Sequence, residues 1–179
     1  MKNNKGFTLL ELLVVIAIIG ILLGAMTYSV NSVSGTRAKK FASDLSALVS
    51  QCRIDTMSGA PTPTYLKLYQ ADNGDYYGVL YEGGSTDTYI KASRKLGGGG
   101  IDCTFKTDVG SSYSVGGNYK TSLCLAFDRS NGAFQKLVII PGQSATITGD
   151  FCTSITAASG SGRYVVTLVP ETGYHSVGR

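Results

Sequence analysis

The chain has 179 residues, of which 43% are hydrophobic and 16% are charged, and its 16 Lys and Arg residues outnumber its 12 Asp and Glu residues. His175 is the only histidine, which excludes a multi-histidine metal site and an acid/base pair of two histidines. The resulting net charge of +4 is too small to indicate nucleic-acid binding by itself. The aliphatic and aromatic content suffices for a core, which argues against intrinsic disorder.

The N-terminal segment is the most apolar part of the chain. Residues 7–26 are nearly all apolar and follow Lys2 and Lys5. About 20 such residues at ~1.5 Å per residue cross a ~30 Å hydrocarbon core, and the preceding positive charge predicts a cytoplasmic N-terminus. The stretch exceeds the roughly 7–15 apolar residues of a secretory signal peptide, and no convincing Ala-x-Ala cleavage site follows it.

Glu11 lies inside this apolar segment. An ordinary membrane anchor accounts for the length of the segment but does not explain this carboxylate. A carboxylate in a membrane segment costs several kcal/mol unless it meets a partner, so Glu11 is a candidate functional residue. The alternative is a solvated residue near the membrane face. Ala17, Gly20 and Gly24 add small residues at a spacing that lets helices approach closely in lipid, although any membrane helix can carry that pattern.

The stretch Lys5-Gly6-Phe7-Thr8-Leu9-Leu10-Glu11-Leu12-Leu13-Val14-Val15-Ile16-Ala17-Ile18-Ile19-Gly20 resembles the class III signal of type IV pilins and type II secretion pseudopilins. The resemblance implies that a prepilin peptidase cleaves between Gly6 and Phe7 and that Phe7 is then N-methylated. It also implies that Glu11 pairs with the α-amine of a neighbouring subunit. Many major pilins have a proline where this chain has Tyr28, so the helix kink associated with that proline is not carried over.

Beyond the apolar segment, the pattern predicts that the helix continues as an amphipathic one. Apolar residues recur at three- and four-residue steps from Ala38 to Cys52, with polar residues between them. Ser58-Gly59-Ala60-Pro61 supplies stop signals, so we expect the helix to end near Met57. Ser, Asn and Gly collect in residues 31–35, where we expect a break between an exposed half and a half packed on a head.

The rest of the chain predicts short β-strands joined by turns, so the expected fold class is α+β, with a long helix packed on an antiparallel β-sheet head. The strongest hairpin signal is Asp72-Asn73-Gly74-Asp75 between two Tyr-rich segments. The expected strands cover residues 65–69, 76–81, 89–92, 101–106, 122–128, 134–140, 145–148 and 164–169. The expected division is a leader at 1–6, a transmembrane and assembly helix at 7–30, an amphipathic helix at 31–60 and a head at 61–179.

The order of elements in the head gives a second resemblance, to H-type minor pseudopilins and FimT-like minor pilins. It rests on the Phe127 strand with the turn at Gly132, and on the strand at residues 164–169 that leads into Thr172-Gly173. In those proteins the last turn contains an arginine, whereas here Tyr174 follows Gly173. The resemblance implies a minor subunit.

Four cysteines, Cys52, Cys103, Cys124 and Cys152, make an even count in a domain expected to leave the cytoplasm. Disulfides are the leading interpretation, with three possible pairings, and free buried thiols are the alternative. Zinc is disfavoured because no pair has C-x-x-C spacing and His175 is distant in sequence. No metal or other cofactor is expected.

Other motifs give no catalytic signal. Gly97 to Gly100 lack the Lys-Ser/Thr of a phosphate-binding loop, and Asp72, Asn73 and Asp75 lack the spacing of a calcium loop. No Ser or Cys lies in a nucleophile motif, and His175 is expected in a terminal loop. We therefore expect no enzyme.

The sequence favours a structural filament subunit whose partners are other pilin or pseudopilin subunits, the prepilin peptidase and the cytoplasmic membrane. After assembly the subunit would lie in an extracellular or periplasmic filament. The alternative is a tip module that captures DNA, a polysaccharide or a host surface. For DNA the candidate contacts are Arg163 and Arg179, although backbone binding requires several cations on one face.

Overall fold

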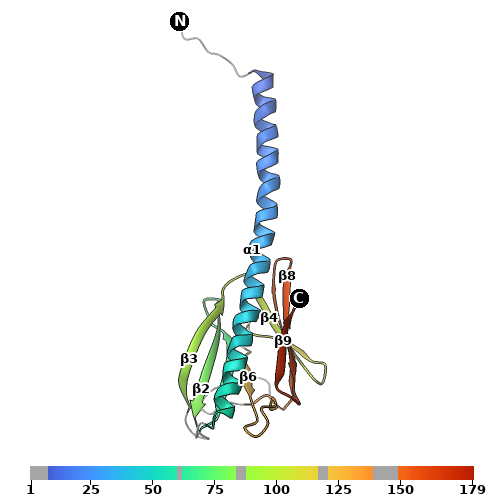
Figure 1. Cartoon of the computed structure of the whole chain (residues 1–179). Coiled ribbons are helices and arrows are strands. Elements are labelled where there is room, and N and C mark those ends of the chain that lie inside the picture. The colour runs from blue at the N-terminus through green and yellow to red at the C-terminus, as the bar shows by residue number, and fades with distance from the viewer. Residues whose placement is uncertain (1–7, 60–61, 84–87, 117–120, 139–148) are drawn as a thin grey trace.

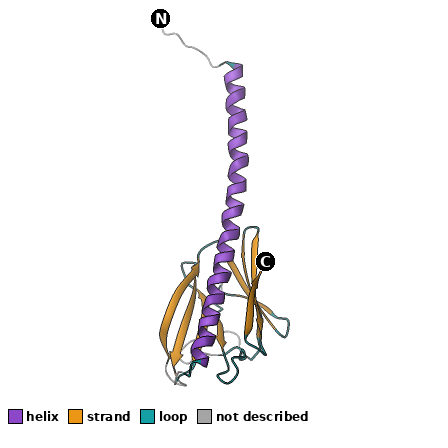
Figure 2. Cartoon of the chain, viewed as in Figure 1, coloured by secondary structure: helices purple, strands orange, loops and turns teal. Residues whose placement is uncertain are grey.

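The protein has one long helix whose C-terminal half lies between two antiparallel sheets (Figures 1 and 2). The structure is a computed structural model that describes residues 8–59, 62–83, 88–116, 121–138 and 149–179, with the backbone alone for residues 25–34. The expected α+β class is confirmed, with two sheets in the head instead of one.

The helix α1, Leu9–Met57, is continuous over 49 residues. Thr8 caps its N-terminus, and the helix ends at Ser58, whose amide donates to the Ile54 carbonyl. Gly59 follows with a φ of 80°, a conformation that glycine adopts without steric cost. The end near Met57 is confirmed, but the expected break at residues 31–35 is wrong, because hydrogen-bonded helix runs through them.

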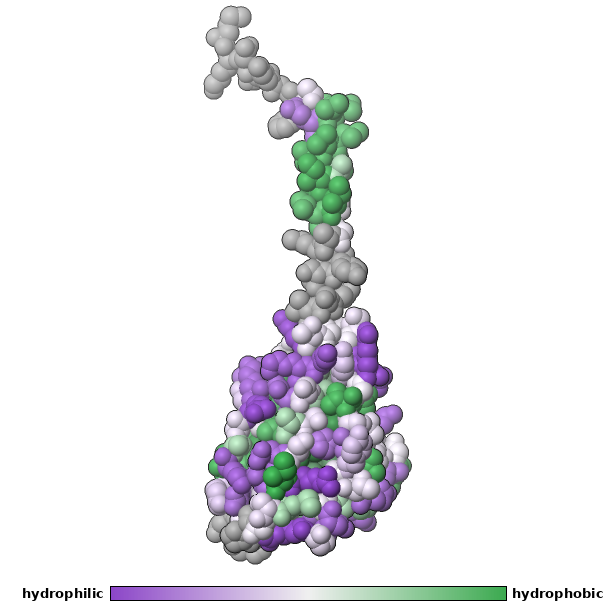
Figure 3. Space-filling view, viewed as in Figure 1, coloured by the Kyte–Doolittle hydropathy of each residue, from purple (hydrophilic) through white to green (hydrophobic). Residues whose placement is uncertain are grey.

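Burial divides α1 into two halves. The large apolar side chains from Leu9 to Leu23 are all exposed and form the apolar stalk visible in Figure 3. From Ala38 onward one face is covered, and Phe41, Ala42 and Leu45 are fully buried. Within the residues that the structure describes, no helix is both long and apolar enough to cross a membrane.

The first sheet has the strand order β3-β2-β1-β6. Its strands are β1 (Thr64–Gln70), β2 (Tyr76–Gly83), β3 (Thr88–Gly97) and β6 (Leu123–Ala126). The predicted hairpin joins β1 and β2, with Gly74 at a φ of 81° in the turn. Strand β3 forms an edge, and its residues from Tyr89 to Lys95 are exposed.

The second sheet has the order β5-β4-β7-β8-β9. Its strands are β4 (Asp102–Thr107), β5 (Ser112–Ser114), β7 (Cys152–Ser159), β8 (Gly162–Val169) and β9 (Tyr174–Gly178). The helix contacts β7, β8 and β9 of this sheet and β1, β2 and β3 of the first. Side chains from α1 and from both sheets share one core, which includes Phe41, Leu66, Phe105 and Val166.

Most of the predicted strands are present. Those at 65–69, 76–81, 89–92, 101–106, 122–128 and 164–169 correspond to β1, β2, β3, β4, β6 and β8. The strand expected at 134–140 is wrong over its described residues, because Phe134 makes only an isolated bridge with Phe127. The strand expected at 145–148 lies outside the described residues. His175 belongs to β9, which corrects its expected place in a loop.

Candidate functional site: the N-terminal half of the helix

Glu11 and Thr8 form a reciprocal capping box at the start of α1. The Glu11 carboxylate accepts hydrogen bonds from the Thr8 amide and the Thr8 hydroxyl, each at 2.9 Å. The Thr8 hydroxyl oxygen in turn accepts from the Glu11 amide at 3.2 Å. These contacts satisfy donors that a helix start leaves free. They also turn the exposed carboxylate toward the N-terminal end of the helix, the end to which residue 7 is joined.

The other residues predicted to function in the N-terminal segment lie only partly within the described residues. Gly6 and Phe7, the expected cleavage site, lie outside the described residues, as do Lys2 and Lys5. Ala17, Gly20 and Gly24 lie on the uncovered half of α1, and an added Cβ at either glycine would meet nothing within 4 Å. Close helix packing through these three residues therefore stays a prediction.

The four cysteines are buried thiols, so the expected disulfides are absent and the alternative of buried thiols describes the structure. Cys52, Cys103 and Cys152 belong to the main core, whereas Cys124 packs with Val79 and Tyr81 on the other face of the first sheet. The thiols form no disulfides with one another because they lie in α1 and in separate strands, where each packs as a small apolar side chain. Burial raises the pKa of the Cys52 thiol to about 12, aided by the negative charge of Asp55.

A serine and the single histidine meet where β9 crosses α1. The Ser50 hydroxyl lies 2.9 Å from His175 Nε2 and donates to the Ser46 carbonyl at 3.0 Å. Nε2 also lies 3.1 Å from that carbonyl, which can only accept, so Nε2 carries the hydrogen. In this tautomer Nε2 cannot take a proton from Ser50, so the pair fastens β9 to the helix and does not activate a nucleophile.

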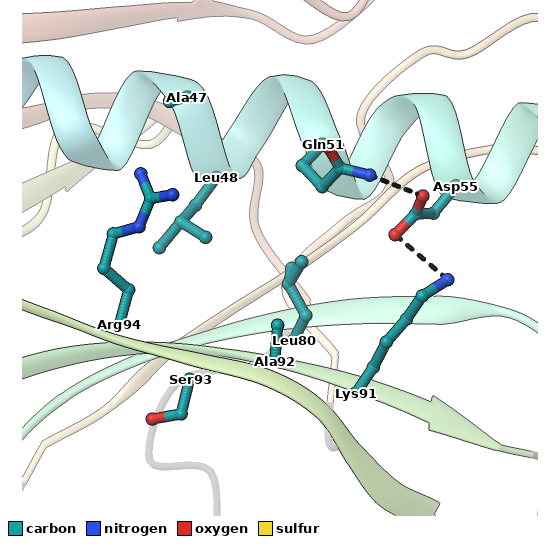
Figure 4. A pocket seen from close by; sticks show the side chains of 9 residues that line it. All are labelled: Ala47, Leu48, Gln51, Asp55, Leu80, Lys91, Ala92, Ser93 and Arg94. Carbon is teal, nitrogen blue, oxygen red and sulfur yellow. Dashed lines mark hydrogen bonds and ion pairs between the residues drawn. The ribbon is translucent and has the colours of Figure 1, made fainter.

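A charged cavity between α1 and β3 was not predicted from the sequence. It measures about 470 Å³, and Figure 4 shows Lys91 extending from β3 toward Asp55 on the helix. Lys91 Nζ lies 3.1 Å from Asp55 and 3.2 Å from Glu82, and Gln51 donates to Asp55 at 2.7 Å. The hydrogen bond to Asp55 raises the pKa of Lys91, and that from Lys91 lowers the pKa of Glu82.

The chemistry of this cavity is that of an ion pair. Asp55, the carboxylate of its lining, is held by Lys91, and the lining contains no thiol and no histidine. Glu82 and Lys91 lie on the paired strands β2 and β3, and only the fold brings them to Asp55 on the helix. Across the described part of the chain, no group of three or more His, Cys, Asp or Glu residues is arranged to hold a metal ion.

Arg163 and Arg179 lie at the same end of the second sheet. Arg163 is on β8, and Arg179 follows Gly178 of β9, which pairs with Val165. This end of the sheet is the one beside Gly35, because an added Cβ on Gly162 would lie 2.3 Å from the Gly35 Cα atom. Both arginines are therefore near the point where α1 enters the head, and not at the opposite end.

Comparison with known protein families bears on the N-terminal segment alone. Residues 1–27 match the family model described as the prokaryotic N-terminal methylation motif. This segment is that of a type IV pilin-like protein. No curated protein and no solved structure matches the chain.

The match supports a type IV pilin-like protein and covers its N-terminal segment. The motif indicates a precursor that a prepilin peptidase processes and methylates, and that interacts with other pilin subunits. It is the motif of membrane-anchored precursors that later assemble into surface filaments. The motif ends at residue 27, so it does not distinguish an H-type head from any other.

Proposed function

We propose that this protein is a non-enzymatic structural subunit, of the minor kind, in a type IV pilus or a type II secretion pseudopilus. The observation that carries the proposal is the uncovered apolar half of α1, which begins with the methylation motif. Leu9, Leu10 and Ile21 are each more than 70% exposed in the single chain. A continuous apolar surface of this size requires a lipid or protein environment.

The proposal assigns one role to each segment, in order along the chain. Residues 1–6 form the leader, residues 7–30 the membrane and assembly helix, residues 31–60 the helix packed on the head, and residues 61–179 the β-rich head. Before assembly, residues 7–30 hold the subunit in the cytoplasmic membrane with its N-terminus in the cytoplasm. After assembly, the same helices pack together in the core of an extracellular or periplasmic filament.

Glu11 sets the register of that packing in the proposal. Its carboxylate already faces the N-terminal end of α1, where cleavage between Gly6 and Phe7 would create a methylated amine. A neighbour's amine at the same depth would neutralise the carboxylate away from water. A buried polar pair of this kind fixes the axial offset between parallel helices.

The minor-subunit assignment rests on the resemblance of the terminal strands to H-type heads. We do not extend the proposal to capture of DNA, a polysaccharide or a host surface. Arg163 and Arg179 lie beside the helix entry, so they would face the filament axis more than its tip.

The test uses the full chain in a cell that contains the assembly machinery, with and without its prepilin peptidase. Intact mass is expected to show a product that begins at methylated Phe7 only when the peptidase is present. Glu11→Gln, which removes the charge and keeps the shape, is expected to be processed normally yet to be absent from sheared filaments.

The matched control is Glu171→Gln, which removes an exposed carboxylate from the head. It is expected to leave both processing and recovery in filaments unchanged. Cleavage beyond Met26, or filaments that contain the Glu11→Gln chain at the level of the unaltered chain, would refute the proposal.

A further inference from the structure

Five cations gather around the point where α1 enters the head. We call them the proximal collar, and they are Arg37, Lys39 and Lys40 on the helix with Arg163 and Arg179 on the second sheet. All five side chains are exposed. The collar lies at the end of the head from which the stalk leaves (Figure 1).

Two glycines bring the parts of the collar together. The turn between β7 and β8 meets the helix at Gly35 and Gly162, where a Cβ on Gly162 would overlap the helix backbone. The contact sets Arg163, the next residue of β8, beside the first turns of α1 that the head covers. The two parts of the collar thus lie at the same end of the head.

The carboxylates at this end are mostly occupied. Asp44 pairs with Lys40 and lies 4.0 Å from Arg94, and Asp75 pairs with Lys95. Asp102 is separated from Arg163 by the intervening strand β7. Among the described residues, Arg37, Lys39 and Arg163 have no carboxylate within ion-pair distance. These three cations are available to an external anion.

A cavity of about 330 Å³ opens within the collar. It is lined by Arg37 and Lys40 on one side and by Gly97, Gly98 and Gly99 on the other. Of its two cations, Lys40 pairs with Asp44, whereas Arg37 forms no ion pair with a described carboxylate.

The length of the stalk places the collar at a defined height. From Leu9 to Gly35 the helix rises 26 × ~1.5 Å, or ~39 Å, which is close to the ~40–45 Å thickness of a bilayer with its headgroups. We propose that, before assembly, the proximal collar docks on anionic phospholipid headgroups of the outer leaflet. The inference rests on the proposed membrane anchoring of residues 7–30.

The test measures the depth of the head in vesicles that hold the full chain. Because the chain contains no tryptophan, Ser161→Trp in the β7–β8 turn provides a single fluorophore near the collar. The vesicles contain either phosphatidylcholine alone or about one-third phosphatidylglycerol, each with a headgroup-attached quencher. Val109→Trp, in the turn at the far end of β4, reports on the opposite end of the head.

Quenching at residue 161 is expected in the anionic vesicles, and to be largely lost in phosphatidylcholine or at about 1 M salt, where the screening length falls to ~3 Å. Replacing Arg37, Lys39 and Arg163 by Gln should weaken docking by about fivefold for each cation removed. The matched control, Lys106→Gln, Arg129→Gln and Lys136→Gln, removes exposed cations elsewhere on the head and should dock normally. Every variant compared carries the same tryptophan, so the affinity of that tryptophan for the membrane interface contributes equally to each measurement.

Three results would overturn the inference. Equal quenching in the two lipid compositions, in a chain that floats with the vesicles, would refute the collar and leave the proposed function standing. Binding of a short DNA duplex through the collar without any effect of phosphatidylglycerol would assign these cations to nucleic acid instead. A chain that floats with neither kind of vesicle would refute the proposed anchoring and the collar together.

Discussion

At the scale of single residues, the thiols show how burial controls chemistry. Desolvation raises the pKa of Cys52 and Cys152 to about 12, and that of Cys103 higher still. Since the thiolate is the reactive form, about one thiol in 10⁴ is ionised at pH 8. The even cysteine count favours disulfides when the sequence alone is considered. In the structure the four cysteines are buried side chains that pack in the protein interior.

We predict that none of the four thiols reacts rapidly with iodoacetamide in the native chain at pH 8. All four should react once the chain is unfolded without a reducing agent, adding four labels by intact mass. The control is Ser93→Cys, which places a thiol on the exposed face of β3 and should be labelled within minutes. A non-reduced chain that accepts only two labels when unfolded would show a disulfide and contradict the structure.

At the scale of elements, the fit between the β7–β8 turn and α1 depends on two glycines with different surroundings. A Cβ on Gly162 would lie 2.3 Å from the Gly35 Cα atom, a contact with backbone that no side chain can relieve. A Cβ on Gly35 would instead lie 3.9 Å from Gly162, an ordinary van der Waals distance. The contact between these glycines therefore tolerates a methyl group on Gly35 but not on Gly162.

This asymmetry predicts opposite outcomes for two similar substitutions. Gly162→Ala should lower the free energy of unfolding by about 1–3 kcal/mol, because the turn must move away from the helix. Gly35→Ala should be neutral or stabilising by up to about 1 kcal/mol, since alanine favours the helix over glycine. Denaturant unfolding of the two variants checks both values, and equal destabilisation by the two would contradict the described packing.

The elements that could be read from the sequence are those with strong local signals. The apolar periodicity of α1 and the Asp72–Asp75 turn between β1 and β2 needed no tertiary information. Strand β7 was missed because Ala, Ser and Thr dominate it, and its conformation comes from pairing with β4 and β8 on its two sides. Strand β9 was missed because it is short and exposed, and it is held by β8 and by the His175 contact with the helix.

The candidate functional residues also fall into those that local sequence signals predict and those that only the fold brings together. Glu11 stands out in the sequence because a charge interrupts an apolar run, and the methylation motif is contiguous. The Lys91–Asp55–Glu82 cluster and the proximal collar combine residues from separate elements, so no local sequence pattern predicts them. The strand expected at 134–140 failed for the converse reason, since Phe134 and Leu137 are buried without a partner strand.

At the scale of the whole molecule, the chain consists of a stalk and a head with separate energetic roles. Every described α1 side chain in the core lies at or beyond Ala38, whereas the described apolar side chains before Gly24 are exposed. Residues 9–23 thus contribute no side chain to the core of the single chain.

We predict that a chain beginning at Asn31 folds without detergent as a monomer and melts within a few degrees of the full chain in detergent. A chain beginning at Ala42 lacks Ala38 and Phe41, both fully buried, and should lose about 3–5 kcal/mol of stability. That loss corresponds to a melting temperature lower by about 10–17 °C. Circular dichroism of the two truncated chains provides the comparison, and a chain from Asn31 that is unfolded would show that residues 1–30 stabilise the head, contrary to the burial described here.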